Sequence, residues 1–536
     1  MISPPARRRW AEAALRLAAL LGLGAAAFVP LLAAQLPRSA DGRPHLLRIV
    51  ALVSALQNGE LWPRFSPDLV YGYGYPLFHY YAPFIYYLGA GLHALGLSAT
   101  AALHLILALA LLAGAAGCWA LAEAWFGGPA AGLAAAAVYV FAPYTLFNLF
   151  GRGAVPEALA VAALPWLLWS LHQARRQATA AALLRLAGLI ALVFLTHNLT
   201  SLVGLALLLG ALGLEAGLDR REAFRASAPV GLAIAAGLAL SAFFWLPAFL
   251  ETGFVQVSEL TTPATLDFRN YFLTPAQLLT PSFTFDPRLE PPSIPVALGL
   301  PQAGLPILAL LLWRRYPEAP TRARVLALAA VWAACLCLTL RLSQPVWEWA
   351  SPLRLLQFPW RLLGPVTVFS ALLAGAGVAS VRAEGRRLLL TGILVAVAGG
   401  LALPWTFVTR YPAAELPPEP TLATLRDYEI ESGGFGLTST GEFLPVGVEA
   451  LPSPADLAWP PAAGLSVERL ALAALPTSVA VLDSTSERLE AGAHFESAQN
   501  FEASWRWFYF PGWRAEVDGR AVAAHAAQRD RAAVAR

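Results

Sequence analysis

Charged side chains are scarce in this chain, and lysine is missing altogether. Asp, Glu, Lys and Arg make up 13% of the 536 residues, about half the fraction of an ordinary soluble protein. This argues against a soluble globular class. The net charge is only +3, and the arginines stand in short clusters between apolar runs. That arrangement is typical of cytoplasmic anchoring and argues against a nucleic-acid partner.

Cysteine is almost as rare, with three residues that all lie inside apolar segments: Cys118, Cys335 and Cys337. This placement argues against a disulfide framework and against a cysteine-ligated zinc site. The sequence contains no P-loop, no glycine-rich dinucleotide fingerprint, no nucleophile elbow and no paired CxxC. Fold and function must therefore be inferred from the apolar runs and from the polar residues between them.

Apolar residues dominate, at 57% of the chain and a mean hydropathy of +0.57, and runs of membrane-spanning length, about 20 residues, recur. The run after Arg7, Arg8 and Arg9 is too long for a signal peptide, so we interpret it as an uncleaved first helix. We predict about eleven spans, at 11–35, 99–122, 129–149, 154–172, 178–196, 199–218, 228–250, 296–313, 323–341, 360–381 and 387–408.

The arginine clusters predict the orientation of these spans. Cytoplasmic loops are enriched in arginine, which assigns the N-terminus and the clusters at 175–176, 220–225, 314–324 and 382–387 to the cytoplasm. The topology traced forward from the N-terminus agrees with the topology traced backward from 175–176 only if the short apolar segment 83–97 does not cross the membrane. Residues 36–98 then form one extracytoplasmic loop with juxtamembrane helices, and the C-terminal part also lies outside the cytoplasm.

The chain changes character near residue 410. Residues 1–409 form the predicted transmembrane domain. Residues 410–536 are rich in proline, glycine and acids, and short alternating runs such as Ser478–Leu482 and Phe501–Phe510 predict antiparallel strands. We therefore expect an all-α polytopic membrane protein with a C-terminal extracytoplasmic β-sandwich-like domain. Because no strand pattern follows Val517–Gly519, we expect the last strands, and with them a final helix, to be either missing or frame-shifted.

Two acids stand out on the predicted outer face. Asp41 follows the first apolar run, and Glu157 begins a later one just after Arg152. A carboxylate there can act as a general base for an acceptor or can help to hold a divalent cation. Each acid can equally be a helix cap or a first-turn residue. An acid inside a helix bundle needs a partner, however, and Arg152 is close enough to be that partner for Glu157.

Further polar residues fall on the same face. His45, His79 and His197 are candidates for lining a pocket, although no spacing among them is diagnostic of a metal. The run Gln357–Arg361 enters a helix from outside, so Trp360 and Arg361 are candidates for binding a phosphate and a lipid tail, with Gln357 beside them. An interfacial Trp/Arg anchor is the alternative interpretation of this run.

These motifs together resemble a bacterial membrane family labelled "6-pyruvoyl-tetrahydropterin synthase-related". The resemblance rests on Asp41 to Arg48, on Gly72-Tyr-Gly-Tyr-Pro-Leu-Phe-His-Tyr-Tyr81, on Arg152-Gly-Ala-Val-Pro-Glu157 and on Gln357-Phe-Pro-Trp-Arg361. Phe510-Pro-Gly-Trp-Arg514 is similar to the end of YfhO-type membrane proteins. The order of an acid, a helix, an aromatic-proline segment and a short apolar helix is also similar to the first outer loop of GT-C glycosyltransferases. In contrast to those enzymes, Asp41 is followed by Gly42 and not by a second acid.

The GT-C resemblance implies a function. It predicts a glycosyltransferase of the bacterial inner membrane that moves a sugar from a polyprenyl-phosphate donor to a glycan or protein acceptor outside the cytoplasm. Asp41 and Glu157 would be catalytic, Arg152 and Arg361 would bind donor phosphate, and the histidines with Gln357 and Trp360 would line the acceptor pocket. A divalent cation is left open. The rival interpretations are a non-catalytic protein of envelope glycan assembly and a lipid or glycan transporter.

Overall fold

The computed structural model describes residues 4–218, 220–260, 266–280, 296–316, 318–452, 469–524, 526–529 and 532–535. The chain divides into two compact units, and each is described by itself. The first contains residues 1–46, 82–243 and 263–419, and the second contains residues 47–81, 244–262 and 420–536. The boundary falls within helix α2 (Gly42–Gln57). The second unit therefore joins the C-terminal residues with two segments that the sequence assigned to the transmembrane domain.

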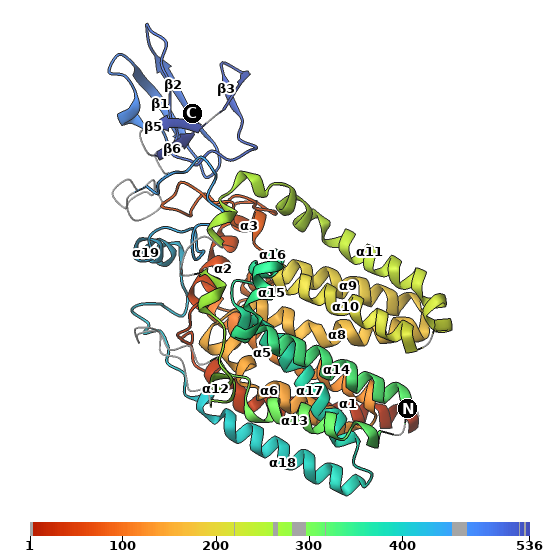
Figure 1. Cartoon of the computed structure of the whole chain (residues 1–536). Helices are drawn as coiled ribbons and strands as arrows, with labels where there is room; N and C mark the ends of the chain where they lie inside the picture. Colours follow the sequence, from red (N-terminus) through yellow and green to blue (C-terminus); the bar gives the residue numbers. More distant parts are fainter. Residues whose placement is uncertain are drawn as a thin grey trace. The chain divides into compact units, whose positions relative to one another are not determined.

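The regular elements in the described part of the first unit are helices (Figure 1). Its principal helices are α1 (Pro4–Phe28), α4 (Phe84–Ala94), α5 (Ala99–Phe126), α6 (Pro129–Val140), α7 (Pro143–Leu146), α8 (Val155–Gln177), α9 (Ala180–Thr196), α10 (Asn198–Leu218), α11 (Arg220–Leu250), α13 (Leu300–Leu311), α14 (Ala319–Leu338), α17 (Leu363–Ala379) and α18 (Glu384–Ala402). Helix α11 continues into the second unit. Short elements join them, including η1 (Val29–Leu31), η2 (Phe147–Gly151), η6 (Phe268–Asn270), α12 (Pro275–Leu279), η7 (Trp313–Arg315), η8 (Arg341–Ser343), α15 (Gln344–Trp349), α16 (Ser351–Arg354), η9 (Pro359–Leu362) and η10 (Leu403–Thr406).

Seven helices of the described chain are long and apolar enough to cross a membrane, and the bent pair Pro129–Val140 and Pro143–Gly151 would make eight. Three further helices are also apolar but shorter: Ala180–Thr196, Asn198–Leu214 and Leu300–Leu311. Each of the eleven predicted spans falls on one of these helices or on the bent pair. The polytopic helical fold is thus confirmed, and the count of eleven crossings stays a prediction.

The buried centre of this unit is built from α5, α6, α8 and α17, which pack on one another. Close approach is possible because small residues line their contacts. A Cβ on Gly375 of α17 would lie 2.7 Å from the carbonyl oxygen of Ala131 in α6, so only glycine allows this spacing. In the most apolar part of Pro359–Ala379, which contains α17, 89% of the residues are buried, whereas in that of Glu384–Thr406, which contains α18, 22% are buried. Helix α18 therefore has the outward apolar surface of a lipid-facing helix.

The second unit holds the rest of α2 with α3 (Leu77–Tyr80), η3 (Thr252–Phe254), η4 (Val257–Leu260), α19 (Leu422–Ser432) and η12 (Leu472–Ala474). Its strands are β1 (Ala480–Ser486), β2 (Ala491–Glu496), β3 (Ala515–Val517), β4 (Arg520–Val522), β5 (Ala526–Arg529) and β6 (Ala532–Ala535). They form three antiparallel two-stranded sheets, β1-β2, β3-β4 and β5-β6. The predicted C-terminal strand region is confirmed, and its sandwich arrangement stays a prediction. The expectation that no strands follow Val517–Gly519 is wrong, because β4, β5 and β6 all lie after Gly519.

One predicted strand is wrong. Phe501–Phe510 lies outside the strands, with a single bridge between Trp505 and Leu470. Its aromatic side chains do not join a ladder because they pack into an aromatic cluster of the second unit. Phe508 lies beside the ring of Tyr73 and donates its amide to the Tyr73 carbonyl at 2.8 Å. Phe510 contacts the rings of Phe65 and His79.

Candidate functional site

The chain unwinds between α7 and α8, and this irregularity forms the candidate site. Pro143 starts α7 after a bend of 51°. The helix then widens into the π-helical turn η2, closed by a bond of 2.7 Å from the Arg152 amide to the Phe147 carbonyl. Such turns are frequent at functional sites. Gly153 follows with φ +68°, and α8 begins at Val155. Arg152 and Asn148 are thereby directed towards the first turn of α8.

The loop that carries Asp41 is held against this turn by its backbone. The amide of Asp41 donates to the Arg152 carbonyl at 2.7 Å, and the amide of Ala40 donates to the Gly151 carbonyl at 3.2 Å. A Cβ on Gly153 would lie 2.4 Å from Ser39 Oγ and 2.8 Å from the nitrogen of Gly42. The absence of a second acid after Asp41 thus has a structural reason, because Gly42 packs against Gly153.

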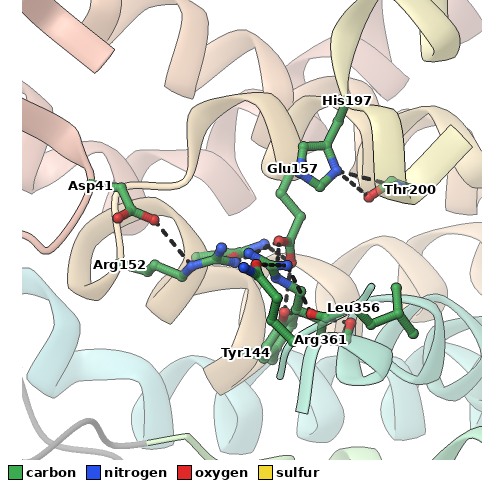
Figure 2. A network of polar contacts seen from close by, with 10 residues as sticks. Asp41, Tyr144, Arg152, Glu157, His197, Thr200, Leu356 and Arg361 are labelled. Carbon is green, nitrogen blue, oxygen red and sulfur yellow. Dashed lines mark hydrogen bonds and ion pairs between the residues drawn. The ribbon is translucent and has the colours of Figure 1, made fainter. Parts of the chain in front are cut away.

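Arg152 lies between the two predicted acids (Figure 2). Its Nε is 3.2 Å from Asp41 Oδ2, and its Nη1 is 2.5 Å from Glu157 Oε2. One guanidinium thus contacts both carboxylates and keeps them within about 8 Å of each other. Their surroundings differ, since the Asp41 side chain is 36% exposed and that of Glu157 is 3% exposed. Asp41 is the acid that solvent and a substrate can reach.

Glu157 is surrounded by donors. Its Oε1 accepts from the Tyr144 hydroxyl at 2.7 Å and from Asn148 Nδ2 at 3.3 Å. Its Oε2 contacts Arg152 and also lies 3.4 Å from Arg361 Nε. Two cations and two neutral donors therefore satisfy one buried carboxylate, which meets the requirement for burying a charge.

Arg361 reaches this network from the turn before α17. Gln357 has φ +61°, and its Oε1 accepts from Arg361 Nη1 at 3.1 Å, while the Leu356 carbonyl accepts from the same nitrogen at 2.8 Å. Trp360 stacks on Phe358 at 4.9 Å between ring centroids. The Arg152 guanidinium carbon lies 5.2 Å from the Trp360 ring centre, within cation–π range.

A family model described as "6-pyruvoyl-tetrahydropterin synthase related domain; membrane protein" matches residues 78–408, which is more than half of the chain. The chain belongs to this family. The resemblance inferred from the motifs is thereby confirmed, and the matched region includes Arg152, Glu157, His197 and Arg361. No curated protein matches the sequence.

Two solved structures are similar to this family member at low identity. ArnT from Cupriavidus metallidurans bound to undecaprenyl phosphate is 14% identical with a TM-score of 0.41, over 71% of this chain and 63% of that chain. The apo oligosaccharyltransferase from Archaeoglobus fulgidus is 14% identical with a TM-score of 0.45, over 74% of this chain and 57% of that chain. Each match thus spans less than two thirds of the solved structure's own chain.

The three predicted histidines have different surroundings in this family member. His197, in the turn between α9 and α10, accepts from the Thr200 amide at 3.2 Å and lies 2.8 Å from the Thr200 hydroxyl; its ring is drawn near Glu157 in Figure 2. His45 is buried in the first unit, 2.8 Å from the Tyr86 hydroxyl. His79 belongs to the second unit, where it lies 2.8 Å from Glu251.

The charges of the network follow from burial and partners. Burial alone would lower the pKa of Arg152, but Glu157 and Asp41 hold that pKa above its ordinary value. Burial lowers the pKa of His197 to about 3, an effect that Glu157 opposes and Arg361 reinforces. His197 is therefore neutral at physiological pH, and the network consists of two cations and two carboxylates.

The donor set does not fit a divalent cation. The Arg152 guanidinium occupies the position between the two carboxylates, and Glu157 already accepts from three donors and pairs with Arg361. Across the described ranges no three His, Cys, Asp or Glu side chains come close enough to hold a metal ion. We therefore derive no step through a metal.

Tyr144 and Asn148 are the site residues that the sequence interpretation missed. Both contact Glu157 from the segment Pro143–Gly151. Their only sequence signal was two polar side chains in an apolar run directly before Gly151-Arg152-Gly153.

Proposed function

We propose that this chain is a membrane glycosyltransferase that moves a sugar from a polyprenyl-phosphate donor to an acceptor outside the cytoplasm. The proposal rests on one observation: the Arg152 guanidinium contacts both the buried Glu157 and the half-exposed Asp41. Sugar transfer from a phosphate needs cations for the leaving group and a base for the acceptor. This network offers both within one cluster.

Arg152 and Arg361 would bind the donor phosphate. Arginine donates in a planar fork that suits phosphate oxygens, and Glu157 holds both guanidinium groups in place. We assign Glu157 a positioning role, because its two oxygens already accept from three donors and pair with Arg361. The Asp41 contact to Arg152 is the more exposed of the two, so a phosphate would compete with Asp41 for the Nε edge of Arg152.

Asp41 would be the general base. In the proposed step the acceptor hydroxyl gives its proton to the Asp41 carboxylate while its oxygen bonds to the anomeric carbon. The bond between that carbon and the phosphate oxygen breaks, and its electron pair leaves with the polyprenyl phosphate, which the arginines stabilise. Direct attack inverts the anomeric configuration. Trp360 and His197 flank the cations and are the candidates to contact the sugar.

The two rivals fit the network less well. A non-catalytic assembly protein predicts that Asp41 and Glu157 point apart, each used as a helix cap, whereas here they share Arg152. A transporter predicts polar residues near the bilayer centre, whereas these residues gather where α8 and α17 begin. We accordingly propose that the network lies at the extracytoplasmic side of the bacterial inner membrane, with the N-terminus in the cytoplasm.

The purified full chain can be tested in lipid nanodiscs with a panel of radiolabelled polyprenyl-phosphate sugars and extracts of cell-envelope acceptors. We expect one donor to be consumed, with release of free polyprenyl phosphate and labelling of the acceptor. Loss of this turnover in Arg361→Gln, with Arg269→Gln as an exposed control, would link it to the network. If no donor is consumed while the protein stays folded, the proposal is wrong.

A further inference from the structure

A short helical segment after α14 exposes an apolar face. Helix α14 ends at Leu338 and is followed by η8 and α15. Leu342, Val346 and Trp349 recur at intervals of four and three residues, so they lie on one helical face. Their exposed fractions are 69%, 45% and 87%. Large apolar side chains gathered on one exposed face need an explanation, and we call these three residues the apolar ridge.

The opposite face of this segment is fixed to the protein. Trp347 is fully buried and stacks on Phe268 at 5.6 Å between ring centroids. Its indole nitrogen donates to the Leu338 carbonyl at 3.0 Å, and Ser343 Oγ donates to the same carbonyl at 3.2 Å. Because these bonds hold α15 to the end of α14, the segment cannot rotate to bury the ridge.

The ridge continues the apolar outer surface of a membrane helix. Only three residues separate the end of α14 from Leu342, and α14 itself exposes Leu326 and Val331. Figure 1 shows α15 and α16 directly after the end of α14. A helix of six residues spans about 9 Å, so α15 is too short to cross a bilayer. It must begin near the depth at which α14 leaves the membrane.

The chemistry of the ridge and of its flanks matches a membrane interface. Tryptophan is enriched where acyl chains meet headgroups. The exposed Arg341 begins the segment, and the exposed Arg354, in the following α16, donates to the Trp347 carbonyl at 3.3 Å. The neighbouring Glu348 points to a polar flank, where it contacts Arg269 Nε at 3.1 Å. The segment thus has an apolar face with arginines beside it, as in interfacial helices that lie on lipid.

We propose that η8 and α15 form an interfacial anchor whose apolar ridge inserts into the lipid leaflet at the C-terminal end of α14. The chain runs from α15 through α16 to Leu356, whose carbonyl accepts from Arg361. The anchor therefore fixes the depth at which Arg361 lies relative to the lipid headgroups. This inference concerns the lipid surface and does not depend on the proposed transferase function.

A single-cysteine experiment tests the anchor. Cys118, Cys335 and Cys337 are replaced by alanine, and W349C or E348C is labelled with an environment-sensitive fluorophore in nanodiscs. We expect nitroxide-labelled lipid to lower the emission at position 349 about two-fold, with little quenching by aqueous iodide. At position 348, one residue away and on the polar flank, we expect iodide to quench and the nitroxide lipid to have little effect.

Two results would overturn the anchor. Equal iodide quenching at 348 and 349, without nitroxide quenching, would show that the ridge lies in water. Protection of position 349 from both quenchers would show that protein and not lipid covers it. Circular dichroism and size-exclusion profiles that match those of the unlabelled chain identify the labelled variants that are folded, and only those are compared.

Discussion

Arg152 illustrates how one side chain can define a site at the residue scale. Its guanidinium contacts Asp41 and Glu157 and lies over the Trp360 ring. The two acids are not equivalent partners, because one is buried and the other is half-exposed. Removing the buried acid should affect the whole network, whereas removing the exposed acid should affect chemistry alone.

Glu157→Gln should destabilise the protein. The substitution leaves Arg152 and Arg361 buried without their shared carboxylate, which costs about 3–5 kcal/mol for a buried pair. Thermal unfolding of the purified variant in detergent should therefore begin at a clearly lower temperature than that of the wild type. Glu348→Gln is the matched control, because Glu348 also pairs with an arginine but is exposed, and it should unfold like the wild type. Equal unfolding temperatures of the two variants would contradict the claim that Glu157 stabilises the buried arginines.

Gly153→Ala should separate the Asp41 loop from Arg152. Alanine at φ +68° is strained by about 1–3 kcal/mol, and its Cβ would collide with Ser39 Oγ and the Gly42 backbone. We expect a loss of both stability and turnover, measured by thermal unfolding and donor consumption. Gly377→Ala in α17 is the control, because its Cβ would meet no atom within 4 Å. A Gly153→Ala variant as active as this control would show that the close approach is not needed.

At the scale of elements, α19 carries a buried carboxylate that organises two loops of the second unit. Glu429 Oε2 accepts from the Tyr71 amide at 3.1 Å, and the amides of Val70, Gly436 and Leu437 also donate to it. Val70, Tyr71 and Leu437 have positive φ values of 50°, 56° and 62°. Non-glycine residues persist in this conformation only where their surroundings hold them, so Glu429 explains the shape of both loops.

The pKa of Glu429 predicts a pH dependence for these loops. Burial raises this pKa from 4.5 to about 7, although the backbone donors oppose the effect. The folded unit therefore binds this proton more tightly than the unfolded chain, and stability is lost as pH rises from about 4.5 through 7. Hydrogen exchange in 66–75 and 433–441 should accelerate over that range beyond the intrinsic rate increase. Glu429→Gln should remove the dependence, and a slope that persists in this variant would refute the assignment.

At the scale of the whole molecule, the sequence predicted the membrane helices well, because each apolar run must satisfy its own backbone as a helix. Asp41, Arg152, Glu157 and Arg361 could be proposed as one cluster because the arginine distribution assigned all four to one face. Their arrangement could not be predicted. The π-helical turn that directs Arg152 between the acids, and Tyr144 and Asn148 beside Glu157, depend on tertiary contacts that leave no periodic pattern.

In the C-terminal region, alternation of apolar and polar residues predicted strands only in part. Alternation correctly indicated strands near Ser478–Leu482, where β1 pairs with β2. The same reasoning failed for Phe501–Phe510, since aromatic side chains that serve a packed cluster alternate much like those of a strand. The grouping of 47–81 and 244–262 with the C-terminal residues also has no local signal, because it depends on which distant segments pack together.

The predicted topology can be tested with exposed positions on either side of α4. Its eleven residues span about 16 Å, half the thickness of the hydrocarbon core. A membrane-impermeant maleimide added outside intact cells should therefore label both Leu61→Cys and Leu95→Cys. Gln177→Cys, next to the arginine cluster at 175–176, should be labelled only after the membrane is opened. Labelling of Leu61→Cys alone would mean that α4 crosses the membrane.

Sugar transfer by Asp41→Asn tests the central claim most directly. The acceptor-dependent rate is measured in nanodiscs with the donor that the wild type consumes, beside Asp267→Asn, whose parent carboxylate is similarly exposed and also pairs with an arginine. If Asp41 is the base, its variant should unfold like the wild type but transfer sugar at least about 100-fold more slowly, while the control stays unchanged. Sugar transfer by Asp41→Asn at the wild-type rate would contradict the claim that Asp41 is the general base.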